Sequence, residues 1–482
     1  MNLKENMNRQ STRLENNTDE ISGVLKGIEN ASKIITSTMG GTGKNVLLYE
    51  EGNLHFTKDG VSVAKKIKFT NKQEDAGAQL MINAANNTVN QCGDGTTLTS
   101  LMVNEFVSKL FKEVKDNPVN DVLDYTKLKI AEIAEELKSN SVKIESYDDI
   151  YRIALTSCKS DTLAKLIESV YRKTGFNASI SVEMSENLNQ TYVEFTEGLT
   201  FDNGYINKGF ANKDNGNCSF EKPEVQIFDE ELSDTVAFTE IADYYNAEGI
   251  PLVILAPDYS DGFIKWALTN KVYQNLKICL LKLPGWGMSV DENVKDLKAF
   301  LTDNKCNKIT ITDSSFTIYN NPEKRKIRNR IKQLTSRMEV ETEMFRVEDF
   351  QKRIHKLQQT AAIIYVGGTT RKTAEEEYDR IEDAVGACRS ALVMGYVPGQ
   401  GISLITLKTE LEPWLKEIME SPYNTILKNA HLKAPEQLIP YNVRTRQYDN
   451  NLVDPTYVII KALENSFALA ELLINTSYTL HD

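Results

Sequence analysis

Apolar residues at helical spacing divide the chain into two helical halves with a different kind of sequence between them. The first helix is predicted over 21–38, and three glycines at 40, 41 and 43 end it. Two short strands are expected next, over 45–49 and 54–57, before helices that continue to about residue 140. The apolar face of the first helix consists of Ile21, Val24, Leu25, Ile28, Ala31 and Ile34.

The middle of the chain, from about 190 to 320, alternates strand-like apolar runs with helical stretches, which is typical of an α/β block. A highly charged helical segment is predicted over 321–359, and helices continue from there to about residue 473. The pattern therefore predicts an α/β insertion between two helical halves. The strand-like runs lie at 192–195, 251–255, 278–283 and 309–312.

Length and composition restrict the class of protein. A chain of 482 residues is expected to form two to four domains, and 41% hydrophobic with 26% charged residues is typical of a globular protein. The net charge of -12 disfavours general binding to nucleic acid. Six scattered cysteines and four separated histidines predict no zinc site. Because the first 19 residues are polar and the apolar runs are too short to span a bilayer, a cytoplasmic protein without a membrane role is expected.

A glycine-rich turn with one carboxylate, Gly93-Asp94-Gly95-Thr96-Thr97, precedes an amphipathic helix. Backbone N–H groups at a helix N-terminus favour anions, glycines allow close approach to a phosphate, and threonine hydroxyls add donors. Asp94 could carry Mg²⁺, which binds one or two carboxylates together with phosphate oxygens. The turn suggests nucleotide hydrolysis, although an ordinary helix N-cap explains an isolated pentapeptide as well.

Other glycine-rich segments that could hold a phosphate come from both ends of the chain and not from the middle block. The turn at 93–97 is not a Walker A loop, because no Gly-Lys-Ser/Thr follows it at the required spacing. If the two helical halves pack into one domain, these segments can converge on a single nucleotide. They are 38–45, 58–60, 93–97 and 398–401.

Five sequence blocks resemble the signature blocks of the group I chaperonins, the GroEL family, and occur in that family's order. They are TKDGVSVA at 57–64, GDGTT at 93–97, DRIEDA at 379–384, VPGQG at 397–401 and VDPT at 453–456. The likeness extends into the middle block through EGLTFDNGY at 197–205 and PGWG at 284–287. The chain is similar to this family over nearly its whole length, as a divergent form that resembles the chaperonins encoded by large bacteriophages.

The resemblance implies a multidomain α fold with an α/β insertion, the fold of a GroEL-like chaperonin subunit. A helical equatorial domain that binds ATP would comprise 1–139 and 394–482, and a small intermediate domain would comprise 140–196 and 362–393. An α/β apical domain that binds substrate polypeptides would comprise 197–361.

The resemblance also implies a site for ATP and Mg²⁺, with a K⁺ ion at Lys58 and Thr97 as a further option. It assigns Asp94 to Mg²⁺, and it makes Asp59 and Asp383 the catalytic acidic pair near the attacking water. Phosphoryl transfer needs charge neutralisation and a positioned water, so carboxylates suffice. Because Asp383 lies in the presumed intermediate segment, hydrolysis would wait for domain closure. The implied nucleotide-binding residues are Thr38, Met39, Gly40, Lys58, Gly93, Asp94, Gly95, Thr96, Thr97, Gly399, Gln400, Gly401, Asn442 and Asp454.

Purely structural roles stay open for the acidic residues. Asp59 could be an ordinary turn residue, and Asp383 could lie on the solvated face of an acidic helix. Asp454 precedes Pro455, a pair that in general only marks the start of a helix.

Two apolar helical stretches, at 232–245 and 263–273, could capture polypeptides that have not buried their own apolar side chains. The resemblance nominates Tyr205, Phe210, Ile264 and Leu268 as polypeptide-binding positions, although each could equally be a core residue. A basic run over 324–332 is interpreted as a solvated helix face and not as a nucleic-acid patch, because no aromatic residues interleave with it.

The predicted function is an ATP-dependent chaperonin that captures non-native polypeptides and promotes their folding in a ring cavity. The expected partners are identical subunits in a single or double ring of seven, polypeptide clients and a GroES-like co-chaperonin, but no nucleic acid and no membrane. If the protein is phage-encoded, its location would be the host cytoplasm. A nucleotide-binding scaffold or holdase with little productive cycling is the alternative, and an unrelated Mg²⁺-dependent phosphotransferase ranks last.

Several positions depart from the commonest family form. Gly41 stands where proline is usual, Leu98 replaces a third threonine and Gln400 interrupts a glycine triplet. In the hinge between the intermediate and apical segments, 358–360 replace a glycine pair, so large apical rotations are expected to be stiffer. These departures motivate the holdase alternative.

Overall fold

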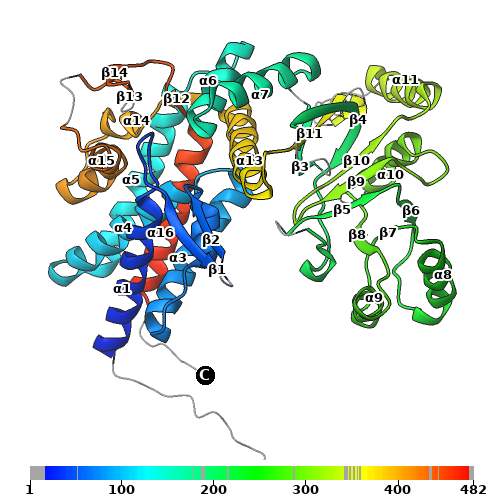
Figure 1. Ribbon diagram of the computed structural model, residues 1–482, viewed down its shortest axis with the longest axis horizontal. Helices are drawn as coiled ribbons and strands as arrows, with labels where there is room; N and C mark the ends of the chain where they lie inside the picture. Colours follow the sequence, from blue (N-terminus) through cyan, green and yellow to red (C-terminus); the bar gives the residue numbers. More distant parts are fainter. Residues whose placement is uncertain are drawn as a thin grey trace, which may run out of the picture. The chain divides into compact units, whose positions relative to one another are not determined.

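The computed structural model forms two compact units of different secondary structure (Figure 1). The helical unit comprises Met1–Arg172, Met184–Gln190 and Val366–Asp482, and the sheet unit comprises Lys173–Glu183 and Thr191–Tyr365. Within these units the structure describes residues 17–50, 53–176, 178–185, 190–213, 216–285, 288–340, 346, 349–350, 353–354, 356–357, 360–433, 437–442 and 445–476.

The helical unit is built from both ends of the chain. Its helices are α1 (Asn17–Thr36), α2 (Gly60–Lys66), α3 (Lys72–Cys92), α4 (Thr96–Asp116), α5 (Val119–Asn140), α6 (Tyr147–Cys158), α7 (Asp161–Thr174), α13 (Arg371–Met394), α14 (Ile402–Ile405), α15 (Pro413–Asn429) and α16 (Thr456–Ile474). Its short strands are β1 (Val46–Glu50), β2 (Asn53–Thr57), β12 (Tyr396–Pro398), β13 (Tyr441–Asn442), β14 (Gln447–Tyr448) and β15 (Val453–Pro455).

One hydrophobic core joins the two ends of the chain within the helical unit. Helix α16 packs against α3 and α4, which in turn pack against α1. The buried rings of Phe106 on α4 and Phe467 on α16 lie 6.0 Å apart in this core. Because full burial of one large apolar side chain contributes about 1.5–3 kcal/mol, this shared core is sufficient to hold the two distant stretches together.

The sheet unit combines a six-stranded sheet with a smaller parallel sheet. Its strands are β3 (Ser179–Met184), β4 (Tyr192–Phe201), β5 (Cys218–Glu221), β6 (Glu224–Ile227), β7 (Leu252–Ala256), β8 (Ile278–Lys282), β9 (Lys308–Ile311), β10 (Phe316–Asn320) and β11 (Thr360–Val366). Its helices are η1 (Lys208–Phe210), α8 (Thr235–Glu248), α9 (Asp261–Tyr273), α10 (Met288–Phe300) and α11 (Lys324–Val340).

Strand order follows the apolar pattern of the sheet unit. The larger sheet has the order β3-β11-β4-β10-β9-β5, and the smaller has the order β6-β7-β8. The smaller sheet is parallel, and α8 and α9 are its two crossover connections. Residues of β7 and most of β8 are buried, as expected for parallel strands covered by helices.

The basic run on α11 is not a simple solvated face. Arg330 is buried and donates hydrogen bonds to Asp296 and Glu292, at 2.7 Å in each case. Buried Arg353 also donates to Asp296, at 2.6 Å. The interpretation of the run as wholly solvent-facing is therefore wrong for Arg330, because a charge that is removed from water requires paired partners.

The predicted organisation agrees with these elements. The helix expected over 21–38 is α1, the strands expected at 45–49 and 54–57 are β1 and β2, and the four apolar runs of the middle block are β4, β7, β8 and β9. Nine of the described strands were not predicted: β3, β5, β6 and β10 to β15. The expectation that only helices follow residue 359 is therefore wrong, because β11 to β15 lie in that part of the chain. The division into three domains stays a prediction, and hinge positions 358 and 359 lie outside the described residues. Across the described ranges, no helix has the length and apolar character needed to span a membrane.

Candidate functional site

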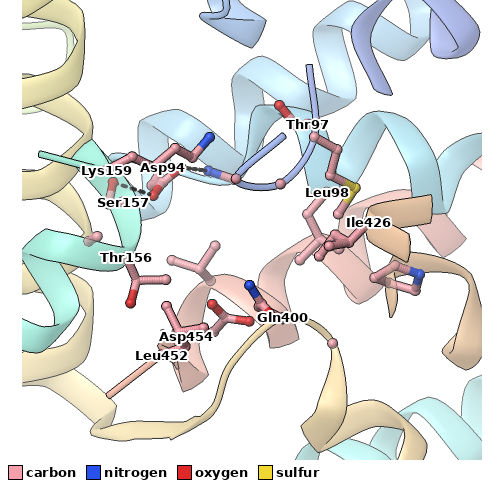
Figure 2. Close-up of a pocket in the computed structure, with 18 of the residues that line it drawn as sticks. Asp94, Thr97, Leu98, Thr156, Ser157, Lys159, Gln400, Ile426, Leu452 and Asp454 are labelled. Carbon is pink, nitrogen blue, oxygen red and sulfur yellow. Dashed lines mark hydrogen bonds between the residues drawn. The ribbon is translucent and has the colours of Figure 1, made fainter. Parts of the chain in front are cut away.

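A cavity of about 360 Å³ lies in the helical unit, where segments from distant parts of the chain meet (Figure 2). Its size is within the range of ligand-binding pockets. The loop after α1, the turn before α2, the turn before α4, the end of α6, one face of α13 and the segments around β12 and β15 all contribute to its wall.

Most of the predicted nucleotide-binding residues line this one cavity. Three do not: Gly93 ends α3, Thr96 is buried at the start of α4, and Gly399 donates its backbone N–H to the carbonyl of Leu452 at 2.9 Å. The predicted residues in the cavity wall are Thr38, Met39, Gly40, Lys58, Asp59, Asp94, Gly95, Thr97, Asp383, Gln400, Gly401, Asn442 and Asp454.

The turn before α4 leaves the N-terminus of that helix open toward the cavity. Gly93 and Gly95 have φ values of 73° and 109°, in the left-handed region that favours glycine. Gly95 is the N-cap residue, and no side chain among the described residues caps the first turn of α4. The first N–H groups of a helix have no intrahelical partner, so they remain available to an anion. This observation fits a phosphate group.

Asp94 lies in the same turn and is held in place by two hydrogen bonds. Its Oδ1 accepts from the N–H of Gly95 at 2.6 Å, and its Oδ2 accepts from the hydroxyl of Ser157 at 3.2 Å (Figure 2). Burial raises the pKa of Asp94 above its ordinary value, against the effect of these hydrogen bonds and of the Lys159 charge. A cation bound at Asp94 would stabilise the ionised carboxylate.

Asp383 reaches the cavity because α13 packs unusually close to the turn that follows α3. A Cβ atom on Gly386 would lie 2.3 Å from the carbonyl oxygen of Gly93, so only glycine permits this approach. One turn later, Ser390 donates its hydroxyl to the carbonyl of Cys92 at 2.6 Å. Because residues three and four apart share a helix face, Asp383, Gly386 and Ser390 all face the same turn.

Three carboxylates influence one another in this cavity. Burial raises the pKa of Asp383 well above its ordinary value, and the charges of Asp94 and Asp59 raise it further. No hydrogen bond to the Asp383 carboxylate occurs in the part of the chain that the structure describes. Asp383 is therefore partly buried and has no hydrogen-bond partner among the described residues. It does not lie on a solvated helix face, which was the alternative left open by the sequence.

Asp59 has a structural role in this conformation. Its carboxylate accepts hydrogen bonds from the backbone N–H groups of Val61 and Ser62, which makes it the N-cap of α2. Asp59 therefore has the structural role in a turn that the alternative interpretation expected. It also lines the cavity. Adjacent Lys58 lines the cavity too.

The end of α6 contributes residues that the sequence did not reveal as site residues. Thr156, Ser157 and Lys159 line the cavity, and the hydroxyl oxygen of Thr156 accepts from the N–H of Val453 at 3.3 Å. Desolvation lowers the pKa of Lys159, although Asp94 and Asp383 oppose this effect. Lys159 is nevertheless an exposed residue, and it lies at the wall of the cavity. No glycine cluster or familiar motif marks this helix end.

The opposite side of the cavity is formed where β12 pairs with β15. Gln400 and Gly401 have φ values of 59° and 77°, and their backbone N–H groups donate to the Asp454 carboxylate. Burial raises the pKa of Asp454 to about 6 despite these hydrogen bonds. The side chain of Asn442 donates to Asp449 at 3.4 Å.

Apolar side chains cover the remaining wall of the cavity and could contact a flat aromatic base. Leu98, which departs from the commonest family form, is one of them. The loop after α1 is fixed nearby, because Asn429 on α15 donates to the carbonyls of Thr36 and Met39 at 2.9 and 3.0 Å. The apolar lining residues are Leu98, Ile153, Leu155, Leu404, Ile426, Leu452, Val453, Val458 and Ile459.

A cation site made only of protein ligands is not found: no group of three or more His, Cys, Asp or Glu side chains in the described ranges could hold a metal ion. Mg²⁺ characteristically takes one or two carboxylates and completes its coordination with phosphate oxygens and water. Asp94 at the open N-terminus of α4 therefore fits Mg²⁺ that arrives with a nucleotide.

The predicted polypeptide-binding residues lie in the sheet unit and differ in burial. Tyr205, Ile264 and Leu268 are partly buried against its core, whereas Phe210 is fully buried. Phe210 therefore cannot contact a client in this conformation. The most exposed apolar side chains on α8 and α9 are instead Val236, Tyr244, Val272 and Tyr273.

Comparisons with known proteins agree on one class. Residues 31–247 match the TCP-1/cpn60 chaperonin family. The GroEL chaperonins of Orientia tsutsugamushi and of its strain Boryong are 28% identical to this chain over 515 residues, which covers 95% of this chain and 92% and 93% of theirs.

Solved structures show the same fold. The crystal structure of chaperonin gp146 from the bacteriophage EL 2 (Pseudomonas aeruginosa), in the presence of ATP-BeFx, matches with a TM-score of 0.72 at 20% identity, over 97% of this chain and 99% of that chain. A second crystal form of gp146 matches with a TM-score of 0.66 at 21% identity. The fold is that of a chaperonin subunit. In sequence the chain is similar to the GroEL chaperonins and in fold to a bacteriophage chaperonin, and it is divergent from both.

The glycine contact between α13 and the turn after α3 leads to a stability prediction. Gly386→Ala would place a methyl group against the backbone of Gly93, so the free energy of unfolding should fall by about 1–3 kcal/mol. Urea denaturation measures this change. The control is Gly262→Ala on α9, where a Cβ would meet only the Ser260 hydroxyl at 3.8 Å. Equal stability of Gly386→Ala and wild type would contradict the close contact.

A second prediction concerns pH. Burial, together with the charges of Asp59 and Glu382, raises the pKa of Asp379 from 3.8 to about 7. Between these values the folded state binds the proton that the unfolded state has lost, so stability falls as pH rises from about 4 to about 7. Asp379→Asn should therefore raise the melting temperature at about pH 8, and the gain should vanish below about pH 4.

The control for this pH effect is Glu375→Gln. Glu375 lies on the same helix, and its carboxylate pairs with Arg371 at the surface. A melting-temperature gain for Asp379→Asn that does not change between about pH 4 and pH 8 would rule out the stated cause.

Proposed function

We propose that this protein is an ATP-dependent chaperonin, which captures non-native polypeptides and promotes their folding through cycles of Mg-ATP binding and hydrolysis. One observation carries the proposal: the open N-terminus of α4, Asp94 and Asp383 line the same cavity. This combination supplies a phosphate site, a cation ligand and an acidic group at one place. The presence of ATP-BeFx in the gp146 crystals is consistent with it.

The residues have distinct roles in this proposal. Backbone N–H groups at the start of α4 and the Thr97 hydroxyl bind the phosphates, Lys58 adds positive charge, and a K⁺ ion could share the Lys58 and Thr97 side of the cavity. Asp94 holds Mg²⁺, which neutralises phosphate charge when it is bound. The segments around Gln400 and Asp454 contact the ribose, and the apolar wall contacts the base.

Asp383 is the better candidate for positioning the attacking water. The Asp59 carboxylate is already engaged by two backbone N–H groups of α2, whereas the Asp383 carboxylate has no hydrogen-bond partner in the described chain. Its raised pKa makes it a stronger base than an ordinary carboxylate once it is ionised. Asp59 then supports the site by fixing α2 and by its negative charge.

The sheet unit supplies the proposed client surface. The exposed apolar side chains of α8 and α9 would bind polypeptides that have not buried their own apolar residues. In the working assembly, identical subunits form a ring of seven, single or double, with a GroES-like co-chaperonin, in the cytoplasm of the cell or of a phage-infected host.

Asp383 provides the direct test of hydrolysis. Asp383→Ala should lower steady-state ATP turnover about 100-fold or more, as is typical for loss of a group that assists proton transfer. ATP binding, measured separately, should persist, because phosphate contacts at α4 remain. The control Glu375→Ala changes an acidic residue of the same helix whose partner is Arg371 at the surface. Unchanged ATP turnover in Asp383→Ala would contradict the proposed role of Asp383 in hydrolysis.

Client capture can be tested on α8. Replacement of both Val236 and Tyr244 by serine should weaken the suppression of client aggregation and leave thermal stability nearly unchanged, because these side chains are 78% and 59% exposed. The control is Leu128→Ser on α5, also 58% exposed but in the helical unit. If wild type, the double variant and Leu128→Ser all suppressed client aggregation equally, clients would bind at another surface.

Refolding assays separate the two candidate functions. A chaperonin with productive cycles restores the activity of a denatured client when ATP is added. A holdase suppresses aggregation without ATP-dependent recovery of the client, and this result would favour the alternative that the altered hinge at 358–360 suggests.

A further inference from the structure

Helix α13, which carries Asp383, is packed differently along its two halves. From Ala384 to Ala391 nearly every residue is buried, and the helix contacts α6 and the turn after α3 there. Before Asp383 the buried residues form a single stripe with one member in each turn. They are Ala374, Tyr378 and Ile381. Asp383 therefore lies where a half of the helix that is covered on all sides meets a half that is covered on one side.

Polar contacts join the less covered half of α13 to α2 and β2. The Ser62 hydroxyl on α2 donates to Oδ2 of Asp379 at 3.3 Å, and Lys372 donates to a backbone carbonyl of β2 at 2.9 Å. Asp379 and Asp383 are four residues apart and share a helix face, whereas Asp59 and Ser62 both belong to the start of α2. The hydrogen bond of Asp379 therefore helps to set how close Asp383 lies to the cavity residues that precede α2.

This contact brings negative charges together. The charged groups that face Asp379 are Asp59 and Lys65 of α2 and Glu382 of α13, and Asp383 is affected by the charge of Asp379. Asp379 is partly buried, and burial, followed by the charges of Asp59 and Glu382, raises its pKa to about 7, against its hydrogen bond and Lys65. Because the ordinary pKa of this carboxyl is 3.8, the contact between α13 and α2 weakens as pH rises from about 4 to about 7.

We propose that Asp379 is a positioning residue for hydrolysis: with its proton it keeps α13 against α2 and Asp383 at the cavity, and without its proton it lets this half of α13 withdraw. The inference rests on the ATP hydrolysis proposed above and adds control by pH to it. Asp379 is not among the described residues of the cavity wall, so it acts through Asp383 and not on the nucleotide. Two carboxyl groups of one helix then act in opposite protonation states, since Asp383 assists hydrolysis when it is ionised.

Steady-state ATP turnover between about pH 5.5 and pH 8.5 tests this role, with kcat and KM determined separately. Asp379→Asn keeps an oxygen that can accept from Ser62 and never becomes charged. The ratio of its kcat to that of wild type should rise by up to about tenfold per pH unit and become level above about pH 7. The KM for ATP should change less than about twofold, because the variant leaves the cavity wall intact.

Ser62 separates positioning from a purely electrostatic effect of Asp379 on Asp383. Ser62→Ala removes the hydrogen bond but no charge, so kcat at about pH 6 should fall about threefold or more. Ser62→Thr keeps the hydroxyl and should keep the wild-type kcat. The matched control is Glu375→Gln, which removes a carboxylate of α13 that pairs with Arg371 at the surface and should keep the wild-type pH profile.

Melting curves at each pH establish that every variant is folded at the assay temperature, where a change in stability alone leaves kcat unaltered. If wild type does not hydrolyse ATP, the proposed function itself is overturned. If wild type hydrolyses ATP but the kcat ratio of Asp379→Asn to wild type does not change with pH, only the role of Asp379 is overturned. A wild-type kcat in Ser62→Ala would equally overturn that role.

Discussion

The close contact between Gly93 and Gly386 is the constraint on which the site depends. The backbone of α13 can approach the turn after α3 only because neither residue has a side chain. That approach brings Asp383 to the cavity of Asp94, and the Ser390 hydroxyl fixes the next turn of the helix against Cys92. A bulkier residue at either position would move the helix and separate the acidic groups, although no charged residue would have changed.

Electrostatics then give the cavity its preference for a ligand. Burial and the negative charges of Asp94 and Asp59 raise the pKa of Asp383, and Lys58 and Lys159 have no ion-pair partner in the described chain. Carboxylates this close together are unfavourable without a nearby cation. A nucleotide with a divalent cation supplies both signs of charge, so its binding would relieve both imbalances. The same arrangement explains why α6, which lies far from the glycine-rich loops in sequence, belongs to the site together with α13.

The sequence predicted two helical halves around an α/β insertion and the glycine-rich segments of the cavity wall, because apolar periodicity and glycine-rich turns are local signals. Asp94 and Gln400 lie in glycine-rich segments, whereas Asp454 was assigned only through the family resemblance; all three line the cavity. Lys159 could not be found in this way, because its place depends on where α6 ends and on how that helix docks. The pairing of Arg330 on the basic helix and the full burial of Phe210 likewise result from tertiary packing, which one sequence does not display.

The most direct measurement is a cryo-electron microscopy reconstruction of the protein with Mg²⁺ and a non-hydrolysable ATP analogue. The account predicts one nucleotide in each helical unit, with its phosphates at the N-terminus of α4 and its terminal phosphate beside Asp94 and Asp383. A folded protein that carries the nucleotide at another place, or that shows this cavity closed by side chains with Asp383 far from Asp94, would contradict it.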